Sequence, residues 1–303
     1  MTRFGSRSAV PTQDRLIVTA ELTRQKIQQQ KELPTLTPDI HRILTACQDN
    51  DINQTELADI LGESPTIAAR ILGLANSAFF GQRGGVHALP HAISVLGFVT
   101  VRSVSAGLAL AGTLDTRNCP SFRPDHYWLS ATLSATLAQR IAPLVAADLR
   151  PPSDTAYLAG LLHNIGLLAL VHLHPVEMDQ AFTAYANDPQ RTLGEHIHDV
   201  LGTDHYQAGV WLGSKWHFPN NLLLVMEHHY DPSYRGDHWP AVLLQGLCAH
   251  WADCIIGGQT CFETSPEEIS ALGLSEPAIE KAWQGMFDHL DRIRAISGAF
   301  VSQ

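Results

Sequence analysis

The sequence has few cysteines and no pattern that would use them in disulfides or metal sites. Its five cysteines are odd in number and include no Cys-x-x-Cys pair. Reduced thiols are the simplest interpretation of such a set. The N-terminal segment, residues 1–34, is polar and lacks the apolar core of a secretory signal. We therefore expect a cytoplasmic protein without structural disulfides.

The sequence also lacks an excess of basic residues and an unbroken apolar run. It has 20 Lys and Arg against 30 Asp and Glu, a net charge of −10. That balance argues against nucleic acid as the main partner. The longest apolar stretch, 157–173, is interrupted by His163, Asn164 and His172, as in a core helix that does not span a membrane. We expect no nucleic-acid partner and no membrane segment.

No convincing period-two alternation is present, whereas apolar residues recur at helical spacing along the chain. Asn53 with Glu56, and Ser265 with Glu268, have the spacing of helix capping boxes. The pattern predicts continuous helices over 153–173 and 275–296. The fold class is therefore all-α, a multi-helix bundle.

Residues 54–76 could form a helix-turn-helix, the unit that many proteins insert into DNA. The second helix of such a unit needs polar or basic side chains that reach the bases. Here that helix offers Arg70 among small and apolar residues. DNA binding is therefore the weakest of the functions considered.

The chain has 16 histidines, several of them beside acidic residues in its second half. A divalent metal needs several such side chains converging on one point. Neighbours such as His228 and His229 diverge by ~100° on a helix, so one face cannot present both equally. A single histidine on an apolar helix is more often a core residue than a ligand, and only a shared pattern makes a metal site credible.

Such a pattern exists, because six blocks occur in the order found in the HDOD family, a bacterial branch of the HD superfamily related to HD-GYP phosphodiesterases. The blocks are LPTL at 33–36, LANSAFFG at 74–81, AISVLG at 92–97, YLAGLLHNIG at 157–166, HHYDP at 228–232 and HWAD at 250–253. The resemblance implies two helical subdomains, the second similar to the HD phosphohydrolase core. In that core a histidine, a His-Asp pair and a distant aspartate hold a metal.

Two of these four ligands are replaced. Ser130 stands where the resemblance places the first histidine, and Asn164 replaces the aspartate of the pair, whereas His163 and Asp253 remain. An amide lacks the charge of a carboxylate, and a hydroxyl is a poor substitute for imidazole. Members of the HDOD family are usually regarded as non-catalytic. We therefore expect no catalytic residue, no metal and no other cofactor.

An alternative metal site remains open. His205, His228 and His229 match positions where HD-GYP proteins carry additional ligands, and they could hold Fe, Mn, Zn or Ni together with His163 and Asp253. His250 also falls in a matching block. Such a site would make the protein a divergent metal-dependent phosphohydrolase or phosphodiesterase.

The motifs divide the chain into an N-terminal helical extension (1–31), an HDOD domain (32–258) and a C-terminal helical unit (259–303). Within the HDOD domain, residues 32–117 form the first half and 124–258 the HD-like half. The C-terminal helix either docks on the core or forms a homodimer or partner surface through Trp283, Met286 and Phe287. The main expectation is a regulatory or scaffolding module of bacterial signal transduction that binds protein partners or a small ligand.

Overall fold

The computed structural model describes residues 13–28, 36–49, 51–81, 85–259 and 265–301. Within these ranges the secondary structure is helical and no strand occurs, which confirms the all-α prediction. The first six helices are α1 (Gln13–Gln28), α2 (Pro38–Gln48), α3 (Gln54–Gly62), α4 (Pro65–Ala75), α5 (Leu89–Leu96) and α6 (Phe98–Ala111). The central helices are α7 (Pro124–Ile141), the short 3-10 helix η1 (Ala142–Leu144), α8 (Ser153–Leu162), α9 (Ile165–Leu173), α10 (Pro175–Asn187), α11 (Leu193–Leu201), α12 (His205–Lys215), α13 (Asn220–His228) and α14 (Trp239–Ile256). The last are α15 (Pro266–Ala271), α16 (Glu276–Phe287) and α17 (Leu290–Val301).

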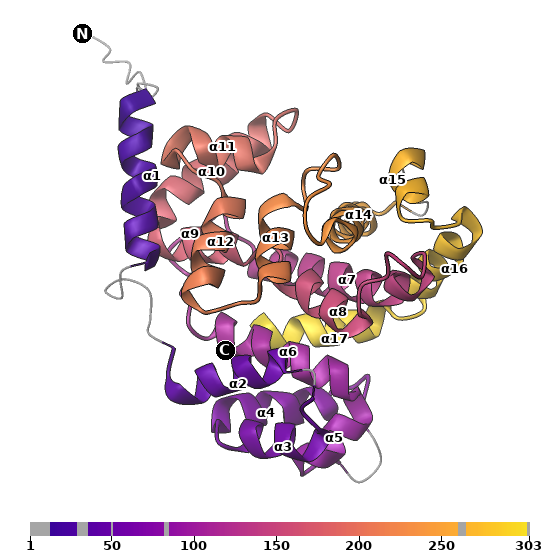
Figure 1. Ribbon diagram of the computed structural model, residues 1–303. Helices are drawn as coiled ribbons and strands as arrows, with labels where there is room; N and C mark the ends of the chain where they lie inside the picture. The colour runs from indigo at the N-terminus through magenta and orange to yellow at the C-terminus, as the bar shows by residue number, and fades with distance from the viewer. Residues whose placement is uncertain (1–12, 29–35, 50, 82–84, 260–264, 302–303) are drawn as a thin grey trace.

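Helices α2 to α6 pack together at one end of the molecule (Figure 1). The predicted capping box begins α3: the Asn53 side chain accepts from the Glu56 N–H, and the Glu56 carboxylate accepts from the Asn53 N–H. Helices α5 and α6 meet at an angle of 111°. Gly97 makes this bend at φ +94°, a conformation that favours glycine. Helix α4, the second helix of the helix-turn-helix considered above, buries Ile67 and Ile71 in this packing.

Helices α7, α8 and α14 form the centre of the second half, and α9 to α13 cover one side (Figure 1). The single helix predicted over 153–173 is wrong. The chain breaks at His163 and Asn164: the backbone of His163 is still helical, whereas that of Asn164 leaves the helical conformation at φ −102°, ψ 18°. Beyond the break, Gly166 packs its backbone directly on α12 at Gly209. Both segments are apolar, so hydrophobic spacing did not reveal the break.

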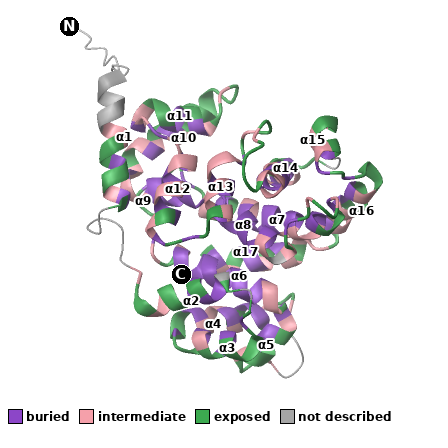
Figure 2. Cartoon of the chain, in the orientation of Figure 1, coloured by how far each residue is buried: buried purple, intermediate pink, exposed green. Residues whose placement is uncertain are grey.

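The 155–173 stretch is long and apolar enough to cross a membrane, yet 83% of its most apolar window is buried within the protein. Figure 2 shows the same concentration of buried residues around α7, α8 and α17. This stretch is a core segment of the helical fold.

The C-terminal helix predicted over 275–296 is also two helices, α16 and α17, and the Ser265 side chain makes no capping hydrogen bond. Both predictions were wrong. Trp283 and Met286 lie in the core formed with α7 and α14, and Phe287 is partly buried against it. Helix α17 contacts α4, α6 and α7, where the Phe300 ring stacks on Trp128 at 4.2 Å between centroids. The C-terminal segment thus bridges the two halves (Figure 1).

Replacing Trp283 with alanine should therefore destabilise the protein by about 3–5 kcal/mol, the usual cost of removing a large buried aromatic side chain. Its side chain is only 1% exposed. Urea unfolding followed by circular dichroism measures the change. Trp211, which is partly buried, provides the matched control, and its alanine variant should lose less. An unchanged unfolding midpoint for Trp283→Ala together with an altered oligomeric state would instead support a partner surface.

The N-terminal helix α1 packs against α9, α11 and α12. The fully buried Thr23 hydroxyl lies 3.1 Å from His174 Nε2, and Lys215 Nζ donates to the Ile27 carbonyl at 2.8 Å. Helix α1 is therefore attached to the second half through both apolar and polar contacts.

Candidate functional site

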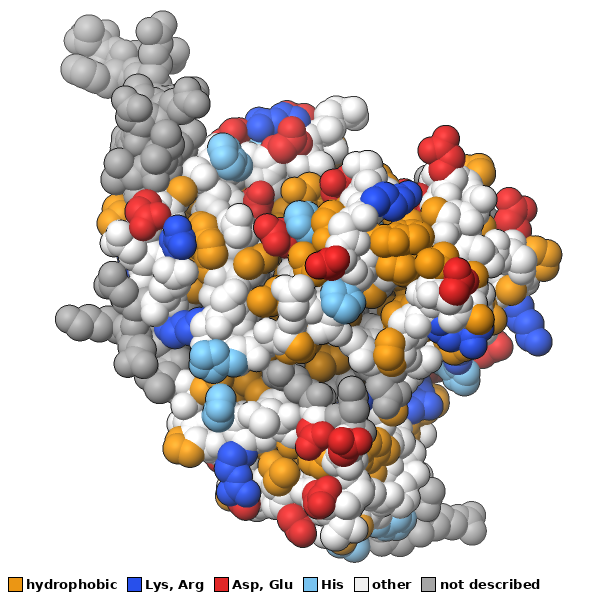
Figure 3. Space-filling model, in the orientation of Figure 1, with side chains coloured by type: hydrophobic (Ala, Val, Ile, Leu, Met, Phe, Trp, Pro, Cys, Tyr) orange, Lys and Arg blue, Asp and Glu red, His pale blue; other side chains and the backbone are white. Residues whose placement is uncertain are grey.

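A large cleft in the second half is lined by residues of seven helices, α7, α9 to α12, α14 and α15, and of the turns between them. Its volume is about 1370 Å³, and its lining includes Ser130 on α7, His163 and Asn164 at the α8–α9 break, and Asp253 on α14. All four positions of the degenerate HD-type set therefore face one space. The face in Figure 3 shows histidine and acidic side chains among apolar ones over α12 to α14.

Ser130 and Asp253 form a direct pair across this cleft. The Ser130 hydroxyl donates to Asp253 Oδ1 at 3.1 Å, which joins α7 to α14. Asp253 is exposed to the cleft, but the surrounding protein partly desolvates its carboxylate and raises its pKa, while the Ser130 hydrogen bond acts in the opposite direction. The hydroxyl thus occupies one acceptor position on Oδ1, one of the two oxygens of this carboxylate.

Three buried histidines, His163, His205 and His229, form the inner part of the cleft. Burial lowers the pKa of His163 to about 4 and those of His205 and His229 to about 3. The rings of His163 and His229 lie 4.8 Å apart, edge to face. These imidazoles are therefore neutral at physiological pH.

Backbone hydrogen bonds fix the tautomers of two of these rings. Nδ1 of His163 lies 2.7 Å from the Gly160 carbonyl, and Nδ1 of His229 lies 2.8 Å from the Val225 carbonyl. A carbonyl only accepts, so Nδ1 donates in both cases and Nε2 carries a lone pair. Metal-binding histidines often have this arrangement, so the two imidazoles are suitable as ligands taken individually.

Several polar atoms near the break have no hydrogen-bond partner within the described part of the chain. They are His163 Nε2, Asn164 Oδ1 and His205 Nδ1. Nevertheless, no group of three His, Cys, Asp or Glu side chains among the described residues converges closely enough to hold a metal ion. Asn164 brings no charge, and the Ser130 hydroxyl is bound to Asp253. The side chains present therefore do not fit the HD metal set.

The other family-matching histidines lie at different places. His228 does not line the cleft, because its ring stacks on Tyr234 at 4.2 Å, away from His229. His250 lines the outer part of the cleft, and its Nε2 is 3.7 Å from Cys254 Sγ. The alternative metal set is thus divided: His163, His205, His229 and Asp253 share the cleft, and His228 does not.

Two tyrosines of the cleft were not predicted from the sequence. The Tyr206 ring lies 3.9 Å from His205 and 4.1 Å from Tyr230, on which it stacks. A continuous series of rings therefore leads from the buried histidines to Tyr230, which is 54% exposed. Both tyrosines directly follow histidines that were singled out, but nothing in the spacing indicated that Tyr206 on α12 would stack on Tyr230, which lies just beyond the end of α13.

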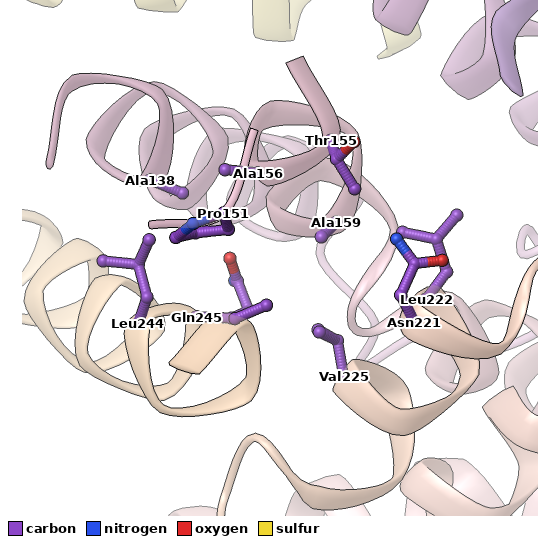
Figure 4. A pocket seen from close by; sticks show the side chains of 11 residues that line it. Ala138, Pro151, Thr155, Ala156, Ala159, Asn221, Leu222, Val225, Leu244 and Gln245 are labelled. Carbon is purple, nitrogen blue, oxygen red and sulfur yellow. The ribbon is translucent and has the colours of Figure 1, made fainter. Parts of the chain in front are cut away.

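A second cavity lies between α7, α8, α13 and α14 (Figure 4). Its volume is about 10 Å³, which is enough for about one water molecule. Gln245 reaches into it and donates from Nε2 to the Ser134 hydroxyl at 2.6 Å. The large cleft is therefore the candidate site for a ligand.

Residues 33–232 match the HDOD domain family, so the chain belongs to that family. An uncharacterised protein from Treponema pallidum is 21% identical over 244 residues, which are 78% of this chain and 45% of that protein. The chain thus spans less than half the length of this relative.

Solved structures show the same fold. A candidate signal transduction protein from Marinobacter aquaeolei is 25% identical with a TM-score of 0.82, over 98% of this chain and 68% of that one. A candidate phosphohydrolase from Shewanella amazonensis is 20% identical with a TM-score of 0.73, over 93% and 98%. An HDOD domain protein of unknown function from Geobacter sulfurreducens is 20% identical with a TM-score of 0.69, over 94% and 99%.

The buried histidines predict a loss of stability in mild acid. Their pKa values are lower in the folded state, so the unfolded chain takes up protons that the folded chain does not. The neutral histidines contribute fully to the free energy of unfolding above about pH 6.5. As the pH decreases toward 4, this free energy falls by ~1.4 kcal/mol per pH unit for each proton that the unfolded chain takes up. Urea unfolding between pH 7 and 4 measures this slope. His163→Asn should make it shallower, with the exposed His198→Asn as the control; an equal slope in both variants would contradict the prediction.

Proposed function

We propose that this protein is a non-catalytic regulatory or scaffolding module of bacterial signal transduction, and that it acts in the cytoplasm by binding a ligand or protein partner. The observation that carries this proposal is the Ser130–Asp253 hydrogen bond in the cleft that Asn164 also lines. Two positions that carry metal ligands in the HD set are thereby occupied by the uncharged side chains of Ser130 and Asn164, and Asp253 is left as the carboxylate of the set. The fold is that of the HDOD family, while two of the four residues that would hold the metal are replaced.

Hydrolysis by an HD-type site depends on a metal that lowers the pKa of bound water. With Asn164 in place of a carboxylate and Ser130 in place of an imidazole, the charge and the lone pair that would hold this metal are missing. The neutral histidines cannot supply a positive charge to a phosphate either. The cleft therefore suits recognition better than phosphoryl chemistry.

The alternative is a divergent metal-dependent phosphohydrolase. It is favoured by His163 and His229, whose Nε2 lone pairs are set as in metal ligands.

DNA binding remains the weakest proposal, because α4 buries its apolar residues within the first half.

The test is to purify the protein without chelator, to measure iron, manganese, zinc and nickel per chain, and to assay hydrolysis of bis(p-nitrophenyl) phosphate with each metal added. We expect far less than one ion per chain and no turnover above buffer. One ion per chain that is lost in His163→Ala, accompanied by turnover, would favour the phosphohydrolase. The exposed His198→Ala is the matched control.

A further inference from the structure

The arginines that line the cleft do not neutralise the carboxylate of Asp253. The two arginines that line it are already paired, Arg123 with Asp125 at 2.9 Å and Arg191 with Asp199 at 2.8 Å. Within the described part of the chain, Asp253 accepts from the Ser130 hydroxyl and forms no ion pair with a lysine or arginine, and the nearby groups that could carry a positive charge are the imidazoles of His126 and His250. An incoming positive charge would therefore find an unneutralised partner inside the cleft.

The buried part of the cleft presents acceptors more than donors. His163 is 2% exposed, its Nε2 carries a lone pair, and this atom has no described partner. Asn164 Oδ1 beside it also has none. Buried acceptors without partners are unfavourable, so a ligand with several N–H donors would gain most here.

The outer part of the cleft presents an aromatic face in an acidic setting. Tyr230 is stacked on Tyr206 on one side and is 54% exposed. Partial burial raises the pKa of its hydroxyl, and the nearby carboxylates of Asp204, Asp231 and Glu227 raise it further. An aromatic ring surrounded by negative charge attracts a planar cation.

We propose that the cleft binds an organic cation with a guanidinium group, which pairs with Asp253 and stacks on the tyrosines at the cleft mouth. Guanidinium is planar, remains charged and offers five N–H donors, whereas an ammonium group is a compact point charge. A phosphate would instead meet an unpaired carboxylate and unpaired acceptors. This inference rests on the proposed function, because a resident metal would occupy the same acceptors.

The test uses isothermal titration calorimetry with butylguanidinium and its neutral analogue butylurea, on protein whose metal content has been measured. We expect butylguanidinium to bind at least about tenfold more tightly than butylurea, as a charge-assisted contact requires. The guanidinium group could belong to a small molecule or to an arginine of a partner protein. A second titration therefore compares the peptide Gly-Arg-Gly with its neutral analogue Gly-citrulline-Gly. Tighter binding of the arginine peptide than of butylguanidinium indicates a partner's arginine, and the reverse indicates a small molecule.

Asp253→Asn should weaken butylguanidinium binding by about tenfold or more, because the hydrogen-bonding shape remains while the charge is lost. Glu280→Gln, which removes an exposed carboxylate on α16, is the matched control and should leave binding unchanged. Tyr230→Ser is a second variant at an exposed position and should also weaken binding. Circular dichroism verifies that each variant is folded.

Equal binding of butylurea, no effect of Asp253→Asn, or binding of inorganic phosphate in place of the cation would each overturn the inference. If the protein is free of metal and does not bind butylguanidinium, only this inference is refuted. One metal ion per chain refutes the proposed function as well.

Discussion

The double variant Ser130→His, Asn164→Asp should bind about one divalent metal ion per chain, whereas the wild type should contain far less. The variant adds one imidazole and one carboxylate to His163 and Asp253, which line the same cleft. It also removes the hydroxyl that now donates to Asp253. Each added group supplies the charge or lone pair that the present set lacks.

The measurement is elemental analysis of both proteins after dialysis against iron, manganese, zinc or nickel. The control variant Ser214→His, Asn187→Asp makes the same two exchanges at exposed positions on α12 and α10 and should remain at the wild-type level. Hydrolysis need not return, because metal sites also depend on the groups that orient their ligands. Equal metal in both double variants would show that the four positions do not form a site.

Replacing Gly166 with valine should unfold the protein or cost at least about 3 kcal/mol, because a side chain there overpacks a rigid contact. A Cβ at this position would overlap the backbone oxygen of His205 and the backbone nitrogen of Gly209, and would lie 2.8 Å from Gly209 Cα. These are main-chain atoms of α12 that cannot rotate away. The same close approach holds His205 beside the α8–α9 break. A substitution that separates Gly166 from α12 should therefore also disrupt the cleft.

Thermal unfolding followed by circular dichroism measures this effect. Gly73 on α4 is the matched control, since a Cβ added there meets no atom within 4 Å. Gly73→Ala should leave stability unchanged or raise it by up to ~1 kcal/mol, through helix propensity alone. If the Gly166→Val protein unfolds at the wild-type temperature, the close backbone contact between Gly166 and α12 is contradicted.

The two failures of helix prediction have one cause. Helical spacing reports which residues are apolar, and α8 and α9 are both apolar along their lengths. The break at Asn164 is a change in backbone conformation. It is stabilised by contacts with α12, some forty residues further along the chain. In the same way, the break between α16 and α17 allows the first helix to cover α7 and the second to reach α4 and α6.

The composition and the local patterns determined the all-helical class and the capping box at Asn53 and Glu56. These are properties of neighbouring residues, and short-range hydrogen bonding and hydrophobic spacing express them directly. Only the tertiary structure decided that Ser130 bonds to Asp253 from 123 positions away, that His229 enters the cleft while His228 turns to Tyr234, and that Tyr206 stacks on Tyr230. Those contacts depend on how separate helices cross, and crossing geometry is set by the packing of the whole core.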